Sequence, residues 1–451
     1  MSQRAANFPI FAAPFLGVLI LSALFLCLIL VILLPPLYVL VPVVSVALGF
    51  AVYRWPVVVI AVVLLLMPFL PLPLQGLKAT GYGWVEAASA LKEIGLLFAA
   101  TVLAFRNGFK LEKVDRWIIA LMVWAIAISL VHPRSSTAIG FKDDFDFVLA
   151  YFVGRVILLN PRWIRTGLWI AAFVALLGLI EFFFIGMGPR MLLMGVSDPS
   201  ELTPTWKADF FGGTRAGSTL GGPLEFGGFC AIVLLVYASF YRKLPKKYSV
   251  VALLVVLGLV SSATRMAWLG LVLGLSFIAI RTGQKLRLAT VGIVCVLLVL
   301  AFVIPWMGLQ DFVAATVSGQ ESSVEVHRAS LQEKTGYVLK HPLGSGAGTV
   351  GPRAAARNPN ALEVESGYLL FGMEYGWIGL ILFASLCGLI FLTFLQESSN
   401  FGIAAGAVAV AMFTMFVFSP IHMDFGLNSW AWLVIGSGIR RHGTAAASLT
   451  K

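Results

Sequence analysis

Two arginines lie in polar segments that could bind an anion. Arg215 lies among glycines and a proline in "GGTRAGSTLGGPLEFGG", residues 212–228, and Arg265 separates two apolar runs in "SSATRMAWLG", residues 261–270. Glycines let a backbone turn tightly and approach a ligand, and the planar fork of donors on arginine suits phosphate. A flexible loop with a solvated Arg215, and an Arg265 that reaches lipid headgroups, are the alternatives.

A third polar segment combines a histidine with a glycine-rich turn. In "EVHRASLQEKTGYVLKHPLGSGAGT", residues 325–349, the apolar spacing predicts a loosely amphipathic helix that carries Arg328 and ends near His341. Gly344, Gly346 and Gly348 follow as a turn whose amides could point at an anion. His341 is a candidate proton acceptor, and simple loop flexibility is the alternative for the glycines.

Two glutamates mark the entry into the next apolar run. In "EVESGYLLFGMEYGWIGL", residues 363–380, Glu365 stands at the start of a predicted helix. It either caps that helix, where a carboxylate meets the positive end of the helix dipole, or accepts a proton in catalysis. Glu374 lies deeper in the apolar run, where an ionisable group indicates a buried partner or a cavity.

The elements that position these residues are predicted to be transmembrane helices. The chain has 451 residues, of which 59% are hydrophobic and only 12% charged, far from the composition of soluble domains. Lipid offers backbone amides no hydrogen-bond partner, so apolar runs of this length indicate helices. The predicted fold is an all-α polytopic membrane protein with 12 to 14 spans. Fourteen candidate spans are read at 10–34, 37–53, 56–72, 89–105, 115–131, 147–160, 166–187, 224–241, 248–264, 266–280, 288–306, 366–395, 401–420 and 424–439.

Basic residues predict the orientation of these spans. Short cytoplasmic loops are enriched in Lys and Arg, and every second connection here is basic, which places both termini in the cytoplasm. The polar intervals 188–223 and 307–365 then lie outside. We expect a bundle at 1–306 with an outer loop at 188–223, a large outer loop with short helices at 307–365, and C-terminal transmembrane helices at 366–451. The basic connections contain Arg4, Arg54, Arg106, Lys110, Lys113, Arg116, Arg162, Arg165, Arg242, Lys243, Lys246, Lys247, Arg281, Lys285, Arg287, Arg440 and Arg441.

Several function classes find no support in the sequence. The formal charge of +11 is explained by orientation, so nucleic acid is not an expected partner. The four cysteines lie within predicted spans without a CxxC pair, which favours packing over redox or metal chemistry. They are Cys27, Cys230, Cys295 and Cys387.

In this order, these segments resemble the O-antigen ligase and O-antigen polymerase family of bacterial polysaccharide assembly. The resemblance rests on Arg215 with Gly217 before a span and on Arg265 at an outer hairpin. It also rests on Arg328 followed by the turn from Pro342 to Gly348, and on the polar pair Glu365-Ser366 before Gly376 and Gly379. Ligases of the family typically place a histidine pair, meaning His-Asn, His-Ser or His-Gln, where this chain has Glu365-Ser366. The departure favours a polymerase of O-antigen or exopolysaccharide repeat units over transfer of glycan to lipid A core.

The resemblance implies a chemistry and a location. Such enzymes are similar in using a polyprenyl-diphosphate-linked glycan as donor and a glycan as acceptor at the periplasmic face of the inner membrane, without cofactor or metal. Arg215 and Arg265 would then stabilise the departing diphosphate, with Arg328 and the turn glycines as further substrate contacts. Glu365, or else His341, would accept the proton of the attacking hydroxyl. A flippase and a chain-length regulator are the protein partners expected.

The glycine-rich turn and two other functions lead to further hypotheses. His341 and the glycines could shape a mobile flap that excludes water. In "KDDFDF", residues 142–147, Asp144 and Asp146 could hold a divalent cation at an outer loop. Alternatively, Glu181, Glu374 and Arg155 could be the coupling groups of a transporter.

Overall fold

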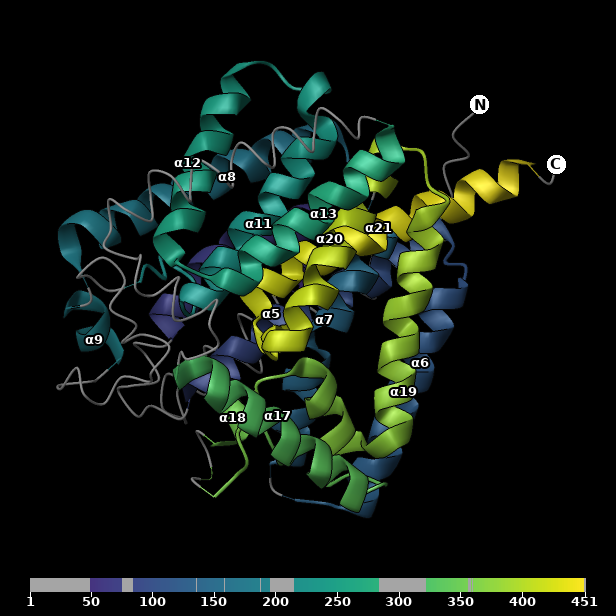
Figure 1. Cartoon of the computed structure of the whole chain (residues 1–451). Helices are drawn as coiled ribbons and strands as arrows, with labels where there is room; N and C mark the ends of the chain where they lie inside the picture. The colour runs from purple at the N-terminus through teal and green to yellow at the C-terminus, as the bar shows by residue number, and fades with distance from the viewer. Residues whose placement is uncertain are drawn as a thin grey trace, which may run out of the picture.

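The computed structural model describes residues 49–74, 84–134, 136–157, 159–186, 188–194, 215–283, 322–355, 358 and 360–449. The chain is an all-α polytopic membrane protein (Figure 1). Six of the described helices are long and apolar enough to cross a membrane. These six are α6 (Lys113–Val131), α8 with the turn after it (Pro161–Ile185), α11 with its last turn (Pro223–Lys243), α13 (Arg265–Thr282), α19 (Gly367–Leu395) and α20 (Asn400–Phe418).

The remaining described elements complete the bundle and its loops. The longer ones are α3 (Pro56–Leu66), α5 (Trp84–Asn107), α7 (Thr137–Val156), α12 (Lys247–Ser262), α17 (Ser322–Lys340) and α21 (Phe425–Leu449). The shorter ones are η1 (Met67–Phe69), the π-helical turn η2 (Glu181–Ile185), α9 (Gly188–Met194), η4 (Tyr241–Lys243), α18 (Pro352–Ala355) and η6 (Ile421–Met423). Within the bundle, α8 itself covers Pro161–Ile180 and α11 covers Pro223–Phe240.

Most predicted spans in the described part of the chain correspond to helices. The predictions at 10–34 and 288–306, and most of 37–53, lie outside the described residues. The prediction at 147–160 is wrong at its start, because α7 begins at Thr137 and includes the acidic segment 142–147. Hydropathy placed this segment in a loop because it counts charges, whereas the structure pairs these carboxylates with other elements. One of them, Asp143, forms an ion pair with Arg353.

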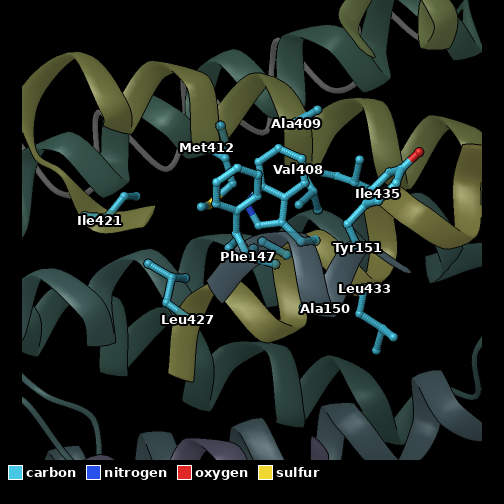
Figure 2. Packing of buried hydrophobic residues seen from close by; sticks show 14 of the residues in the cluster. Phe147, Ala150, Tyr151, Val408, Ala409, Met412, Ile421, Leu427, Leu433 and Ile435 are labelled. Atoms are coloured by element: carbon cyan, nitrogen blue, oxygen red, sulfur yellow. The ribbon is translucent and has the colours of Figure 1, made fainter. Parts of the chain in front are cut away.

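The core is built around α7, α20 and α21. Phe147 and Tyr151 of α7 point toward Val408 and Met412 of α20 in Figure 2. The rings of Phe147 and Trp432 are 4.5 Å apart, and both side chains are fully buried. Described helices from the first and last predicted regions therefore share one hydrophobic core.

Glycines allow α7 and α21 to pack closely. A Cβ at Gly154 would lie 2.3 Å from the carbonyl oxygen of Leu433, and one at Gly436 would lie 2.1 Å from that of Tyr151. Small residues at such contacts let two backbones approach, which is a common basis of helix association in membranes. This close contact fixes α7, whose first half reaches the loops that carry the candidate site.

The connections of the bundle sort to two ends. At one end, which we call the basic end, Arg155 pairs with Asp115 at 2.9 Å, Arg440 donates to the carbonyl of Val156, and Arg281 donates to that of Glu397. At the other, which we call the loop end, residues 132–134, 136–141, 215–222, 341–355, 360–365 and 419–424 meet. Helices α17 and α18 lie far from the C-terminus in Figure 1. The described basic connections, which were predicted to lie on one side of the membrane, therefore lie at one end of the bundle. The compartment that this end faces stays a prediction.

Candidate active site

Arg215 is held against the tight hairpin between α12 and α13. Its side chain is buried, and its Nε donates to the carbonyl of Ser262 at 3.0 Å while Nη2 donates to Oγ1 of Thr264 at 3.1 Å. The amide of Ala216 donates to the carbonyl of Ser261 at 3.0 Å. The hairpin turns at Ala263, which adopts φ 49°. The loop before α11 is therefore attached to the residues that directly precede Arg265.

Arg265 begins α13 beside this attachment and interacts electrostatically with Arg215. Burial, followed by the positive charge of Arg265, lowers the pKa of Arg215 from 12.5 to about 10. Arg215 therefore stays protonated at neutral pH, and the fold keeps two positive charges close together. The two arginines predicted to act together do lie together; their role in catalysis stays a prediction.

A buried ion pair holds the Arg215 loop in shape. Glu181, at the π-helical end of α8, pairs with Nε of Arg190 at 2.7 Å. The same carboxylate accepts the amides of Gly217 at 3.0 Å and Ser218 at 2.6 Å, and Arg190 donates to the carbonyl of Leu220 at 3.1 Å. Each of these bonds fixes part of the backbone that presents Arg215.

A second group of charged residues lies beside the arginines, and its Glu225 was missed by sequence analysis. Glu225, in the first turn of α11, interacts electrostatically with Arg215, Asp424, Arg190 and Arg353. These residues are far apart in sequence, and only the fold brings them together. The one local signal was the position of Glu225 three residues after the paired glycines of the Arg215 segment.

Arg353 connects the large loop to the bundle. In α18, its Nη1 lies 2.5 Å from Oδ1 of Asp143, and its Nη2 donates to the carbonyl of Met423. Burial alone would lower the pKa of Arg353, but the carboxylates of Asp143, Asp146 and Asp424 raise it above its usual value. Arg353 therefore joins α18 to α7 and η6 as a permanent cation.

The acidic segment of α7 does not form the predicted outer-loop cation site. Asp144 and Asp146 are two positions apart on one helix, so their side chains point to different sides. Asp144 instead accepts the hydroxyl of Tyr375 at 2.5 Å. Across the described ranges, no three His, Cys, Asp or Glu side chains are grouped to hold a metal ion. The prediction of a loop was wrong because these carboxylates belong to a helix.

The glycine-rich turn packs against a break in α19. Gly376 has φ 69°, and a Cβ there would lie 2.1 Å from the carbonyl oxygen of Pro342. Across the break, the amide of Trp377 donates to that oxygen at 3.0 Å, and the amide of Gly346 donates to the carbonyl of Glu374 at 2.8 Å. A Cβ at Gly344 would lie 2.4 Å from the same Glu374 oxygen. The glycines are needed because two backbones meet here.

The amides of the turn point at a carboxyl group of the chain itself. Oε1 of Glu374 accepts the amides of Thr349 at 2.9 Å and Val350 at 3.1 Å, and Gly348 contributes a further backbone hydrogen bond. The buried partner expected for Glu374 is therefore the turn itself. In this structure the turn is fastened to α19 along its length, and a mobile flap stays a prediction. Contact of Gly344, Gly346 and Gly348 with substrate stays a prediction.

The remaining predicted residues lie at the edges of this arrangement. His341 is exposed at the end of α17, where its ring stacks on Tyr337 with centroids 4.0 Å apart and its Nδ1 lies 3.0 Å from the Tyr337 carbonyl. Glu365 is half-buried, and the N-cap of α19 is Ser366, which accepts the amide of Leu369. Ser366, and not Glu365, therefore caps α19. The side chain of Arg328 lies outside the described residues.

The charges suggested for a transporter do not form one path. Arg155 pairs with Asp115 at the basic end, Glu181 pairs with Arg190 beside the Arg215 loop, and Glu374 binds the glycine-rich turn. Each is accounted for by a different structural contact. A separate pocket lies between α3, α8, α11 and α21. It is lined by apolar side chains such as Leu64, Trp163 and Trp430, and so offers no group for catalysis.

Comparison with known proteins supports the interpretation of the loop end. No curated protein matches the chain. The model of the family described as O-antigen ligase matches residues 249–384. This region includes α12, α13, the described part of the large loop and the broken start of α19, and thus Arg265, His341, the turn glycines and Glu365. Arg215 lies before it. The match confirms the predicted family, and residues 249–384 are an O-antigen ligase family domain.

Proposed function

We propose that the protein transfers glycan from a polyprenyl-diphosphate carrier to a sugar hydroxyl at the periplasmic face of the bacterial inner membrane. The family places it among membrane glycosyltransferases of the O-antigen ligase and polymerase type. The observation that carries the proposal is the position of Arg215, hydrogen-bonded to the residue next to Arg265. A fold that holds two guanidinium groups together suits a ligand with several negative charges.

The two arginines would act on the leaving group. As the bond from the anomeric carbon to the diphosphate oxygen breaks, negative charge grows on the diphosphate. Donors placed beforehand at that position stabilise the transition state more than the bound substrate. The hydrogen bonds from Arg215 to Ser262 and Thr264 supply this preorganisation. Arg328, on α17, is retained as a further substrate contact, and no metal or nucleotide sugar is part of the proposal.

The attacking hydroxyl needs a proton acceptor, for which the sequence offered Glu365 and His341. Glu365 lies where the loop enters α19, beside the end of α20, since the neighbouring Ser366 donates to the carbonyl of Phe416. His341 lies on the exposed end of α17. Both roles stay proposals.

Two acceptors are compatible with this chemistry. Glu365 in place of the histidine pair typical of ligases favours polymerisation of O-antigen or exopolysaccharide repeat units. The match to the O-antigen ligase family supports the second candidate, transfer of glycan to lipid A core. In either case we propose cytoplasmic termini, with the loop end in the periplasm. A flippase and a chain-length regulator would be the protein partners.

Incubation of the purified full-length protein with polyprenyl-diphosphate oligosaccharide tests the function. A ladder of longer lipid-linked glycans is expected for a polymerase, whereas product that appears only after addition of lipid A core identifies a ligase. Failure of both reactions would contradict the proposal.

The arginines are tested in the same assay. Arg215→Ala and Arg265→Ala should each abolish transfer, because the diphosphate loses its donors, without lowering the yield of folded protein. Arg134→Ala is the matched control, because Arg134 is an exposed arginine at the same end of the bundle. Retained turnover in both test variants would remove the assignment.

A further inference from the structure

Thr264 ties Glu225 to the arginine pair. Its Oγ1 accepts Nη2 of Arg215 at 3.1 Å and itself donates to the carbonyl of Pro223 at 2.8 Å. Pro223 is the first residue of α11, two positions before Glu225. A Cβ at Gly227 would lie 2.7 Å from the Thr264 side chain, so the first turn of α11 packs directly on the hairpin. One threonine thus fixes the distance between the Glu225 backbone and the Arg215 guanidinium.

Glu225 lies within electrostatic reach of the loops of the site. It is only half-buried, although protein surrounds it. The charges that act on it come from α9, α18, the Arg215 loop and the segment before α21, through Arg190, Arg353, Arg215 and Asp424. Glu225 is therefore a partly accessible carboxylate close to the position proposed for the diphosphate.

The carboxylate of Glu225 is less engaged than those around it. Asp424 caps α21 by accepting the amides of Gly426 at 2.7 Å and Leu427 at 3.2 Å. Asp143 pairs with Arg353, and Glu181 pairs with Arg190. Among the described residues, the hydrogen bond assigned to the Glu225 carboxylate is the one from its own amide. It therefore retains capacity to accept a proton from a bound hydroxyl.

We propose that Glu225, rather than Glu365 or His341, is the carboxylate that accepts the proton of the attacking sugar hydroxyl. The inference rests on the proposed function. In the step, the acceptor oxygen forms a bond to the anomeric carbon while the bond from that carbon to the diphosphate oxygen breaks. The diphosphate leaves with the bonding electrons and is held by Arg215 and Arg265. The hydroxyl proton passes to Glu225 and then to water.

A structural role for Glu225 makes a different prediction. A carboxylate in the first turn of α11 also meets the positive end of the helix dipole. Glutamine keeps the size of the side chain and its carbonyl acceptor but removes the negative charge. A role in the helix alone would leave Glu225→Gln active, whereas a role as proton acceptor would not.

The decisive experiment separates donor binding from transfer in the full-length protein in proteoliposomes, with polyprenyl-diphosphate oligosaccharide. Glu225→Gln should bind the donor at least as tightly as the unaltered protein, because a negative charge near the diphosphate is removed. Its single-turnover transfer should fall by roughly 100-fold or more, the usual contribution of a general base. Glu333→Gln, on the exposed face of α17, is the matched control and should transfer normally.

A second variant guards against a folding artefact. Glu225→Ala leaves space for a small acid, so added formate should restore part of its transfer rate, while Arg215→Ala should not respond. Transfer by Glu225→Gln at the unaltered rate, or loss of its donor binding together with transfer, would overturn the inference. Absence of transfer by the unaltered protein would instead contradict the proposed function.

Discussion

The arginine hairpin and the glycine-rich turn both hold ionisable groups near glycines, but they use those groups in opposite ways. At the turn, one oxygen of the buried Glu374 carboxyl group accepts amides of residues 348–350. At the hairpin, Arg215 and Arg265 are held together although their charges repel. A carboxyl group bound by backbone amides stabilises a fold, whereas like charges held together suit a ligand. We therefore assign stability to the turn and chemistry to the hairpin.

The largest effect is expected from filling the break in α19. Gly376→Ala would place a methyl group 2.1 Å from the carbonyl oxygen of Pro342, at a residue with φ 69°. The positive φ alone costs about 1–2 kcal/mol for a residue with a Cβ, and the overlap forces the turn off α19. We expect loss of folded protein, measured as yield of the monodisperse peak in detergent.

Gly388→Ala is the control for this substitution. Gly388 lies on the same helix, and nothing lies within 4 Å of the position of its Cβ. It should give the yield of the unaltered protein. Normal yield of Gly376→Ala would show that the turn and α19 are not locked together.

A smaller effect is expected from Glu374→Gln. One oxygen can still accept the amides of Thr349 and Val350, but the amide group of glutamine must occupy the buried position of Oε2. An ordinary hydrogen bond contributes about 0.5–1.5 kcal/mol, so we expect a lower thermal midpoint and faster amide exchange at 348–350. Transfer per folded molecule should be kept. Loss of transfer with unchanged stability would move the glycine-rich turn into the catalytic machinery.

A substitution in the Glu181–Arg190 ion pair should have an intermediate effect on transfer and little effect on overall stability. Arg190→Lys keeps a charge beside Glu181 but loses the fork that also reaches the carbonyl of Leu220. The Arg215 loop should become less ordered, which raises KM for the donor several-fold, by about 1 kcal/mol in binding. Steady-state kinetics measure this change. An unaltered KM would mean that the ion pair does not position Arg215.

The smallest effect is expected from chelation. Asp144 and Asp146 point to different sides of α7 and do not share a cation. Addition of EDTA to the transfer assay should therefore leave the rate unchanged. A loss of rate that Mg²⁺ restores would support a divalent cation bound at the acidic segment.

Sequence reasoning succeeded where the physical signal is local. Apolar runs predicted the helices because lipid demands internally bonded backbone, and the polar breaks in those runs located Arg215 and Arg265. It failed where contacts between distant parts of the chain determine the local structure. The helical start of α7 at Thr137 depends on partners such as Arg353 for its carboxylates.

Two further features of the site were beyond the reach of sequence reasoning. Glycines that approach an acidic group look alike whether that group is a ligand or Glu374, so the flap hypothesis could not be separated from a fixed turn. Glu225 was not singled out, because its neighbours Asp424 and Arg353 follow it by more than a hundred residues.

The most direct test of the assignment is the affinity of the purified protein for polyprenyl-diphosphate oligosaccharide, measured for Arg215→Ala and for Glu374→Gln side by side. We predict that Arg215→Ala folds normally and loses donor binding, whereas Glu374→Gln is less stable and binds the donor as the unaltered protein does. Equal donor affinity in Arg215→Ala and the unaltered protein would contradict the assignment of the hairpin as the diphosphate site.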